Sequence, residues 1–95
     1  MSVDQSFAPA DFADLVGTEL RLADSELALT VDTVTPLRAH ALREQPFSLI
    51  LRVPPGYRAG QGMYALEHPR LGRIELFCAP IEPVQGQARL EATFN

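Results

Sequence analysis

The chain has 95 residues, of which 46% are hydrophobic and 21% are charged, and its formal net charge is −4. A chain of this length is expected to fold as one domain, 1–95, and to bury about 60 to 65% of its unfolded surface, which argues against a large internal ligand pocket. The negative net charge argues against a general nucleic-acid-binding protein.

The N-terminal segment combines a short polar lead with a short helix. Residues 1–7 lack the basic and apolar regions of a secretory signal, so we expect synthesis in the cytoplasm without a signal peptide. Residues 9–16 begin with a proline, carry acidic residues in the first turns and are followed by a glycine, a pattern typical of a helix. We expect Phe12, Leu15 and Val16 to lie on one face of this helix, over an end of a sheet.

Alternating apolar and polar residues predict three strands in the first half of the chain, over 19–22, 27–34 and 47–53. In the second of these the alternation slips by one residue, and a β-bulge near residues 32–33 would restore it. Residues 37–45 are compatible with a helical turn or with a loop between prolines. Everything after residue 17 therefore indicates antiparallel β structure.

Residues 61–81 read as a β-hairpin. Two alternating runs flank a turn that contains His68, Pro69 and Gly72. We expect the His68 ring to form a hydrogen bond with nearby backbone at this turn, a structural role that is favoured over a catalytic one. The inward-facing residues of the two arms are Tyr64, Leu66, Ile74, Leu76 and Cys78.

Two registers of this hairpin bring the inward residues together, with Leu66 opposite either Ile74 or Leu76. The second would place Glu67 against Glu75, and like charges directly opposite each other are unfavourable. We therefore predict the first register, which places Glu67 opposite Arg73 and Met63 opposite Phe77 on the outer face.

The end of the chain predicts a last strand. Pro80 and Pro83 are expected to end the second arm of the hairpin, and Gln85-Gly86 turns the chain. Alternation over 87–94 places Ala88, Leu90, Ala92 and Phe94 inward. About six short strands and one helix indicate an all-β fold over 18–95, either a small antiparallel barrel or a two-sheet sandwich.

Several groups of residues resemble one family. They are Asp11-Phe12 with Leu15-Val16-Gly17; Pro46-Phe47-Ser48-Leu49; Gln61-Gly62 with Tyr64, Leu66, His68-Pro69 and Leu71-Gly72; Leu76-Phe77 with Pro80-Ile81; and Glu91-Ala92 with Phe94-Asn95. Together they resemble an uncharacterised bacterial family, domain of unknown function six-nine-one-six, over nearly the whole chain. Two departures are Val53-Pro54-Pro55, where a Gly-Pro is expected, and Leu20, where an aromatic residue usually sits.

The resemblance implies no activity, because the family has none assigned. Its members lie near proteins that resemble phage tail collar or tail fibre components, which implies a structural or accessory role. We therefore expect a subunit of a larger assembly, with a place in an exported or phage-like particle as one destination.

Motifs for catalysis or metal binding are weak. Two His and one Cys match no structural zinc spacing, and Glu67 and Glu75 flank an arginine on a strand surface, which is typical of a solvated charge cluster. Cys78 is the only cysteine, so the chain forms no internal disulfide, and we expect an inert buried thiol. We expect no enzyme activity, cofactor, metal or nucleic-acid partner.

A second interpretation is that the protein binds a ligand. It is a small binding barrel, or a weakly marked enzyme, with its site at the loop end near Arg38, Tyr57 and His68. A stable monomer with a ligand-dependent melting shift would favour it. No run of about 18 apolar residues occurs in the sequence, so no membrane span or membrane partner is expected in either case.

The alternation leaves Ile50, Met63 and Phe77 on the outer face, where three apolar residues on adjacent strands could form a contact surface. The N-terminal helix or the 37–45 segment could instead cover them within the chain. Residues 1–35 carry a net charge of −6 and residues 36–95 a net charge of +2, so a head-to-tail contact between copies is electrostatically favourable. We expect a homo-oligomer or a complex with a larger structural protein.

Overall fold

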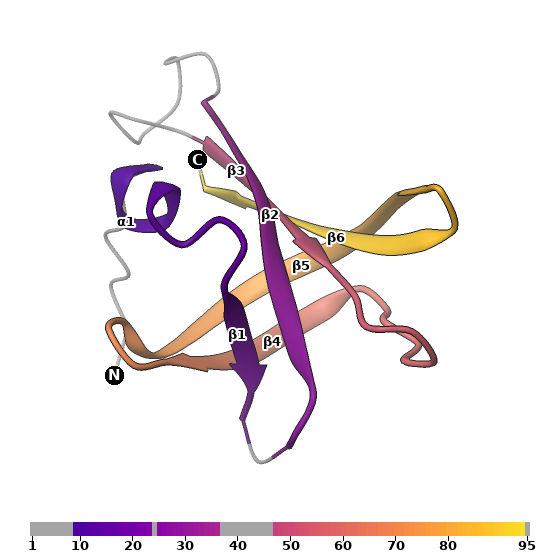
Figure 1. Cartoon of the computed structure of the whole chain (residues 1–95), viewed down its shortest axis with the longest axis horizontal. Helices are drawn as coiled ribbons and strands as arrows, with labels where there is room; N and C mark the ends of the chain where they lie inside the picture. The colour runs from indigo at the N-terminus through magenta and orange to yellow at the C-terminus, as the bar shows by residue number, and fades with distance from the viewer. Residues whose placement is uncertain (1–8, 24, 37–46, 95) are drawn as a thin grey trace.

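The structure, a computed structural model, describes residues 9–23, 25–36 and 47–94. The helix is α1 (Pro9–Ala13), and the strands are β1 (Glu19–Leu22), β2 (Ala28–Pro36), β3 (Phe47–Arg52), β4 (Gly62–His68), β5 (Gly72–Val84) and β6 (Gln87–Phe94). The strands form a closed antiparallel barrel in the order β1-β2-β3-β6-β5-β4 (Figure 1). The all-β prediction is confirmed, and of the two architectures left open the protein adopts the barrel.

The barrel closes where β1 pairs with β4, with Arg21 opposite Glu67 and Leu22 opposite Leu66. Its inner face is apolar, as expected for a small barrel that side chains fill. The buried core consists of Phe12, Leu15, Leu20, Leu29, Val31, Phe47, Leu49, Leu51, Val53, Tyr64, Leu66, Ile74, Leu76, Cys78, Leu90, Ala92 and Phe94.

The helix is shorter than predicted. It ends at Ala13, and a turn follows in which the Leu15 amide donates to the Phe12 carbonyl and Gly17 has a φ of 91°. Phe12 and Leu15 are buried as expected, but Val16 is 50% exposed, so its predicted position over the sheet is wrong. The reason is that the backbone leaves the helical path before Val16, which changes the direction of that side chain.

Three phenylalanines pack together where α1 meets the barrel. The rings of Phe47 and Phe94 stack with centroids 4.3 Å apart, and Phe12 lies 5.9 Å from Phe47 and 5.7 Å from Phe94. Phe47 and Phe94 come from β3 and β6, which pair directly at this position. The ring of Phe12 therefore anchors the helix on two neighbouring strands.

The bulge predicted in β2 is present. Val31 lies opposite Leu51 and Thr33 opposite Ile50, so Asp32 is the extra residue in the pairing with β3. An extra residue on one strand resets the alternation. The apolar residues before and after it can then face the same side.

The register of the central hairpin is confirmed at every position. Leu66 pairs with Ile74, Gly62 with Cys78, Glu67 with Arg73 and Met63 with Phe77. The five residues predicted to face inward, which are Tyr64, Leu66, Ile74, Leu76 and Cys78, are all buried.

His68 has a structural role in the hairpin turn. It pairs with Gly72, whose φ of 72° favours glycine, and its ring Nδ1 accepts a hydrogen bond of 3.0 Å from the Arg70 amide. Pro69 follows at the start of the turn. The predicted hydrogen bond between the His68 ring and nearby backbone is confirmed.

The prediction that Pro80 and Pro83 end the second arm of the hairpin is wrong. β5 continues through Pro80 and Pro83 to Val84, and Pro80 lies opposite Leu90 of β6. The pairing with β4 stops at Cys78, so beyond that residue β6 is the one described strand that pairs with β5. An open strand edge tolerates proline because the missing N–H has no partner to lose there.

The continued strand carries the β5–β6 hairpin beyond the barrel, at the right of Figure 1. Gln85 and Gly86 form its tip, and both have positive φ values, 53° and 80°. Ala88 was predicted to face inward, but it is exposed because this part of the hairpin lies past the core. Val84 is 48% exposed for the same reason.

The lead over 1–7 and the segment over 37–45 lie outside the described residues, as do Arg38 and His40. Within the described ranges no helix is long and apolar enough to cross a membrane.

Candidate functional site

One outer surface of the barrel carries paired apolar side chains. The large hydrophobic residues that are exposed among those the structure describes are Val16, Leu27, Met63, Phe77 and Val84. Of these, Met63 and Phe77 lie directly opposite each other on β4 and β5, with exposed fractions of 64% and 53%. The sequence predicted both as outward-facing, and the structure places them side by side.

Smaller apolar residues extend this pair along the strands. Residues two apart on a strand share a face, so Ala79 and Ile81 follow Phe77 on the outside of β5, and Ala65 follows Met63 on β4. All three are partly exposed. We call Met63, Ala65, Phe77, Ala79 and Ile81 the apolar stripe. The sequence analysis missed its Ile81 end because β5 was expected to stop at Pro80.

Ile50 does not belong to the stripe. It was predicted to be its third large member, but it is only 8% exposed. Its partner on β6 is Glu91, whose carboxylate accepts a hydrogen bond of 2.6 Å from the Ser48 hydroxyl, so the Glu91 side chain passes beside Ile50. Ser48 is itself buried, and both faces of β3 are thus covered within the chain.

Charged groups lie at both ends of the stripe. Glu75 precedes Phe77 on the outer face of β5, and its carboxylate lies 3.9 Å from Arg73 Nε. At the other end, Arg89 lies opposite Ile81. Its guanidinium donates hydrogen bonds of 3.0 and 2.8 Å to the Glu82 carbonyl, which fixes its position. A backbone carbonyl carries no net charge, so these bonds do not neutralise the positive charge of Arg89.

The backbone beside the stripe is poorly suited to strand addition. Among the described strands, none pairs with the β4 side of β5 beyond Cys78, but Pro80 and Pro83 remove two N–H donors from this segment. Prolines on an exposed edge oppose pairing with a strand of another chain. A partner at this surface would therefore contact side chains rather than extend the sheet.

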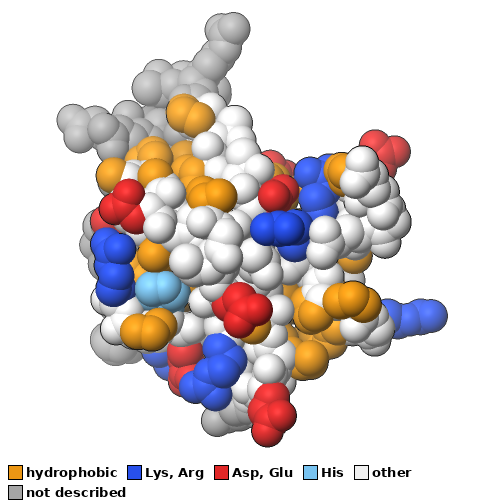
Figure 2. All heavy atoms as spheres, viewed as in Figure 1, with side chains coloured by type: hydrophobic (Ala, Val, Ile, Leu, Met, Phe, Trp, Pro, Cys, Tyr) orange, Lys and Arg blue, Asp and Glu red, His pale blue; other side chains and the backbone are white. Residues whose placement is uncertain are grey.

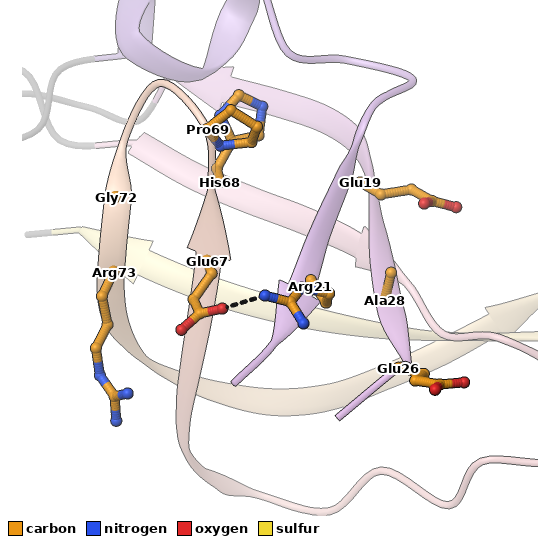
Figure 3. A pocket seen from close by; sticks show the side chains of 9 residues that line it. All are labelled: Glu19, Arg21, Glu26, Ala28, Glu67, His68, Pro69, Gly72 and Arg73. Carbon is orange, nitrogen blue, oxygen red and sulfur yellow. Dashed lines mark hydrogen bonds and ion pairs between the residues drawn. The ribbon is translucent and has the colours of Figure 1, made fainter. Parts of the chain in front are cut away.

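A separate groove of about 590 Å³ lies on the outer surface where β1 meets β4 (Figure 3). It is lined by Glu19, Arg21, Glu26, Ala28, Glu67, His68, Pro69, Gly72 and Arg73. Arg21 Nη2 lies 2.6 Å from Glu67 Oε1 across the barrel closure. Glu67 and Arg73 are opposite each other as predicted, but the carboxylate of Glu67 pairs with Arg21.

We expect Arg21→Ala to lower the free energy of unfolding by less than about 1 kcal/mol, because exposed ion pairs contribute little. The Arg21 side chain is 57% exposed and that of Glu67 is 35% exposed. Urea denaturation at low and high salt would measure the effect, which should shrink as salt screens the pair. A loss of several kcal/mol would mean that this pair is needed to close the barrel.

One family model matches residues 7–94, and its description is Domain of unknown function (DUF6916). The chain belongs to this family. No curated protein and no solved structure matches the chain. Because the DUF6916 description carries no activity, an argument about function depends on the surface of the barrel.

The two described residues of the ligand interpretation, Tyr57 and His68, line separate grooves in this DUF6916 domain. Tyr57 lines two grooves, one with Tyr64 and one with Gln85, whereas His68 lines the groove of Figure 3. Tyr64 donates a 2.5 Å hydrogen bond to the Gly60 carbonyl, and burial raises the pKa of its hydroxyl. These three grooves therefore do not bring Tyr57 and His68 together.

Cysteine, histidine and carboxylate side chains often form reactive sites, so we consider the environments of the described ones. Burial raises the pKa of Cys78 to about 12, so its thiol stays protonated at neutral pH and is a poor nucleophile. Within the described residues, no group of three His, Cys, Asp or Glu side chains is placed to hold a metal ion. The apolar stripe is thus the surface feature that the core and the turns do not explain.

Proposed function

We propose that this domain is a small structural or accessory subunit of a larger assembly, and that it contacts its neighbour through the apolar stripe. The observation that carries the proposal is the pairing of Met63 with Phe77, both more than half exposed on adjacent strands. Single exposed apolar residues are common on protein surfaces, but contiguous ones typically mark interaction sites.

The construction of the barrel supports a binding role for its outside. Core side chains fill the interior, which favours a binding site on the outer surface. The stripe is bordered by charged groups, as an interface core is by its polar rim. The resemblance to a family found near phage-tail-like proteins favours a particle as the assembly, with a larger structural protein or a second copy of the chain as the neighbour.

The test is the double change Met63→Ser with Phe77→Ser, followed by light scattering on the purified protein alone and with the products of neighbouring genes. We expect the parent to show a mass above one chain, or to form a complex, and the variant to lose it. Removing two exposed large apolar side chains takes away the apolar area that an interface would bury.

A matched control is the double change Val16→Ser with Leu27→Ser. These residues are 50% and 39% exposed and precede β1 and β2, outside the stripe on β4 and β5, so the control should keep the mass of the parent. Circular dichroism should show that both variants remain folded. A parent that is monomeric and partner-free, or a folded stripe variant with unchanged mass, would contradict the proposal.

A further inference from the structure

Two grooves without charged lining residues lie at the end of the barrel that carries the segment over 53–61. One, of about 240 Å³, lies between this segment and the tip of the β5–β6 hairpin. The other, of about 390 Å³, lies between this segment, the end of β1 and the start of β4. Among the described residues that line the two grooves none is charged, although 21% of the chain is. At the right of Figure 2, the surface between the hairpin and this segment is mainly orange and white.

The larger polar side chains of these grooves are glutamines and tyrosines. Gln85 and Gln87 line the first groove, Gln61 and Tyr64 line the second, and Tyr57 lines both. A glutamine amide has two N–H donors and one oxygen acceptor. Within the described part of the chain, no hydrogen bond uses the three glutamine amides or the Tyr57 hydroxyl. These groups are therefore available to a ligand.

Gln85 stands where the hairpin tip alone would favour another residue. It has a φ of 53°, and Gly86 after it has a φ of 80°. Hairpin tips with two positive φ values favour Asn, Asp or Gly at the first position, because a left-handed conformation is unfavourable for longer side chains. The side chain of Gln is one methylene longer than that of Asn and lines the first groove. The groove thus gives a reason for Gln that the turn does not.

The segment between the grooves is held in place by hydrogen bonds. The Val53 amide donates to the Ala88 carbonyl at 2.9 Å, and the Tyr57 amide donates to the Pro54 carbonyl at 3.3 Å. Near the end of the segment the Tyr64 hydroxyl donates to the Gly60 carbonyl. Tyr57 also packs against the core. A site fixed in this way loses little conformational entropy when a ligand binds.

The chemistry of the lining selects a neutral ligand rich in hydroxyl groups. A phosphate or carboxylate would find no guanidinium or ammonium group among the described lining residues. A proline-rich peptide offers carbonyl acceptors but few N–H donors, so it would leave the oxygens of the glutamine amides without partners. A sugar hydroxyl both donates and accepts, which matches an amide. The C–H faces of a sugar ring can pack on tyrosine and proline side chains.

We propose that this end of the barrel binds a neutral oligosaccharide, with one sugar unit in each groove and Tyr57 between them. The proposal goes beyond the contact through the apolar stripe. The two surfaces share Met63 and Ala65, which line the second groove, so the variants that test the sugar site leave these two residues unchanged.

The test is a titration of the ¹⁵N-labelled protein with maltose, lactose and chitobiose, followed by backbone amide chemical shifts. We expect at least one of these neutral disaccharides to give saturable shifts with a millimolar Kd, confined to residues 53–65 and 85–88. Absence of saturable shifts in these segments with all three would overturn the proposal. Shifts there with a decaproline peptide or with pyrophosphate, but with no disaccharide, would overturn it as well.

Two variants test the named side chains. The double change Gln85→Ala with Gln87→Ala removes two exposed amides, and Tyr57→Leu keeps apolar volume against the core while it removes the ring and the hydroxyl. We expect each to raise the Kd for the disaccharide at least tenfold, with circular dichroism showing a folded protein. Folded variants that both keep the Kd of the parent would overturn the proposal.

The single change Gln85→Asn separates binding from the turn. Asn adopts the left-handed conformation more readily, so the melting temperature should stay the same or rise while the shorter amide binds the sugar more weakly. Glu26→Gln and His68→Gln are controls in the charged groove of Figure 3 and should leave the Kd unchanged. Shifts that depend on these two residues instead would overturn the assignment of the site.

Light scattering keeps this inference separate from the proposed function. A chain that binds a disaccharide but stays monomeric and partner-free would support the sugar site and contradict the assembly. A chain that assembles through the apolar stripe but gives no shifts with the three disaccharides would do the reverse.

Discussion

Replacing Phe47 with Ala is expected to lower the free energy of unfolding by about 3 to 5 kcal/mol, the range for truncating a buried phenylalanine. Phe47 is fully buried and stacks on Phe94 at 4.3 Å. Its loss leaves a cavity between Phe94 and Phe12, and it removes one of the two rings that hold α1 on the barrel. Urea denaturation followed by circular dichroism would measure the change.

A smaller truncation at the same site provides the control. Phe47→Leu keeps much of the apolar volume, so it should cost clearly less than Phe47→Ala. If Phe47→Ala cost less than about 1 kcal/mol, the three-ring cluster would not belong to the cooperative core. The helix would then be a loosely attached element rather than part of the barrel.

The central hairpin could be predicted to the residue because two independent constraints agreed. Its inward residues have to face the core together, which allows only two registers near Leu66. The charges of Glu67, Arg73 and Glu75 then distinguish the two, and the structure has the register that they favour. Local alternation and nearest-neighbour charge contain this information, so no knowledge of the rest of the fold was needed.

The predictions that failed depend on where other strands begin and end. Pro80 looked like a strand end because a proline breaks a ladder, but β4 no longer runs beside β5 at that point. Ile50 looked exposed because alternation gives the side of a sheet and not what covers it. The ion pair of Arg21 with Glu67 joins residues that meet only when the barrel closes. These features arise from tertiary contacts that periodicity does not encode.

The candidate site was likewise predicted only in part from the sequence. Alternation was sufficient to place Met63 and Phe77 on the outside, and the register placed them opposite each other. The extension to Ile81 and the position of Arg89 beside it depend on the continuation of β5 past Pro80. The sequence therefore predicted the centre of the stripe, and the structure was needed for its Ile81 end.

Truncating Leu76 to Ala is expected to lower the free energy of unfolding by about 2 to 5 kcal/mol. Leu76 is 3% exposed and belongs to the core, whereas Phe77, the next residue on β5, is 53% exposed. Phe77→Ala should change the stability of the single chain by less than about 1 kcal/mol, because it leaves no buried cavity. Similar losses for both variants would contradict the assignment of inner and outer faces.

Protein concentration separates folding from assembly in this pair of variants. If the stripe binds a second copy, the folded chain is stabilised by mass action, and that contribution falls on dilution. The loss caused by Leu76→Ala should therefore persist in dilute protein, while any loss caused by Phe77→Ala should shrink. Thermal melts over a range of concentrations would measure both. A Phe77→Ala loss that stayed constant on dilution would place that ring in the fold of the single chain rather than at an interface.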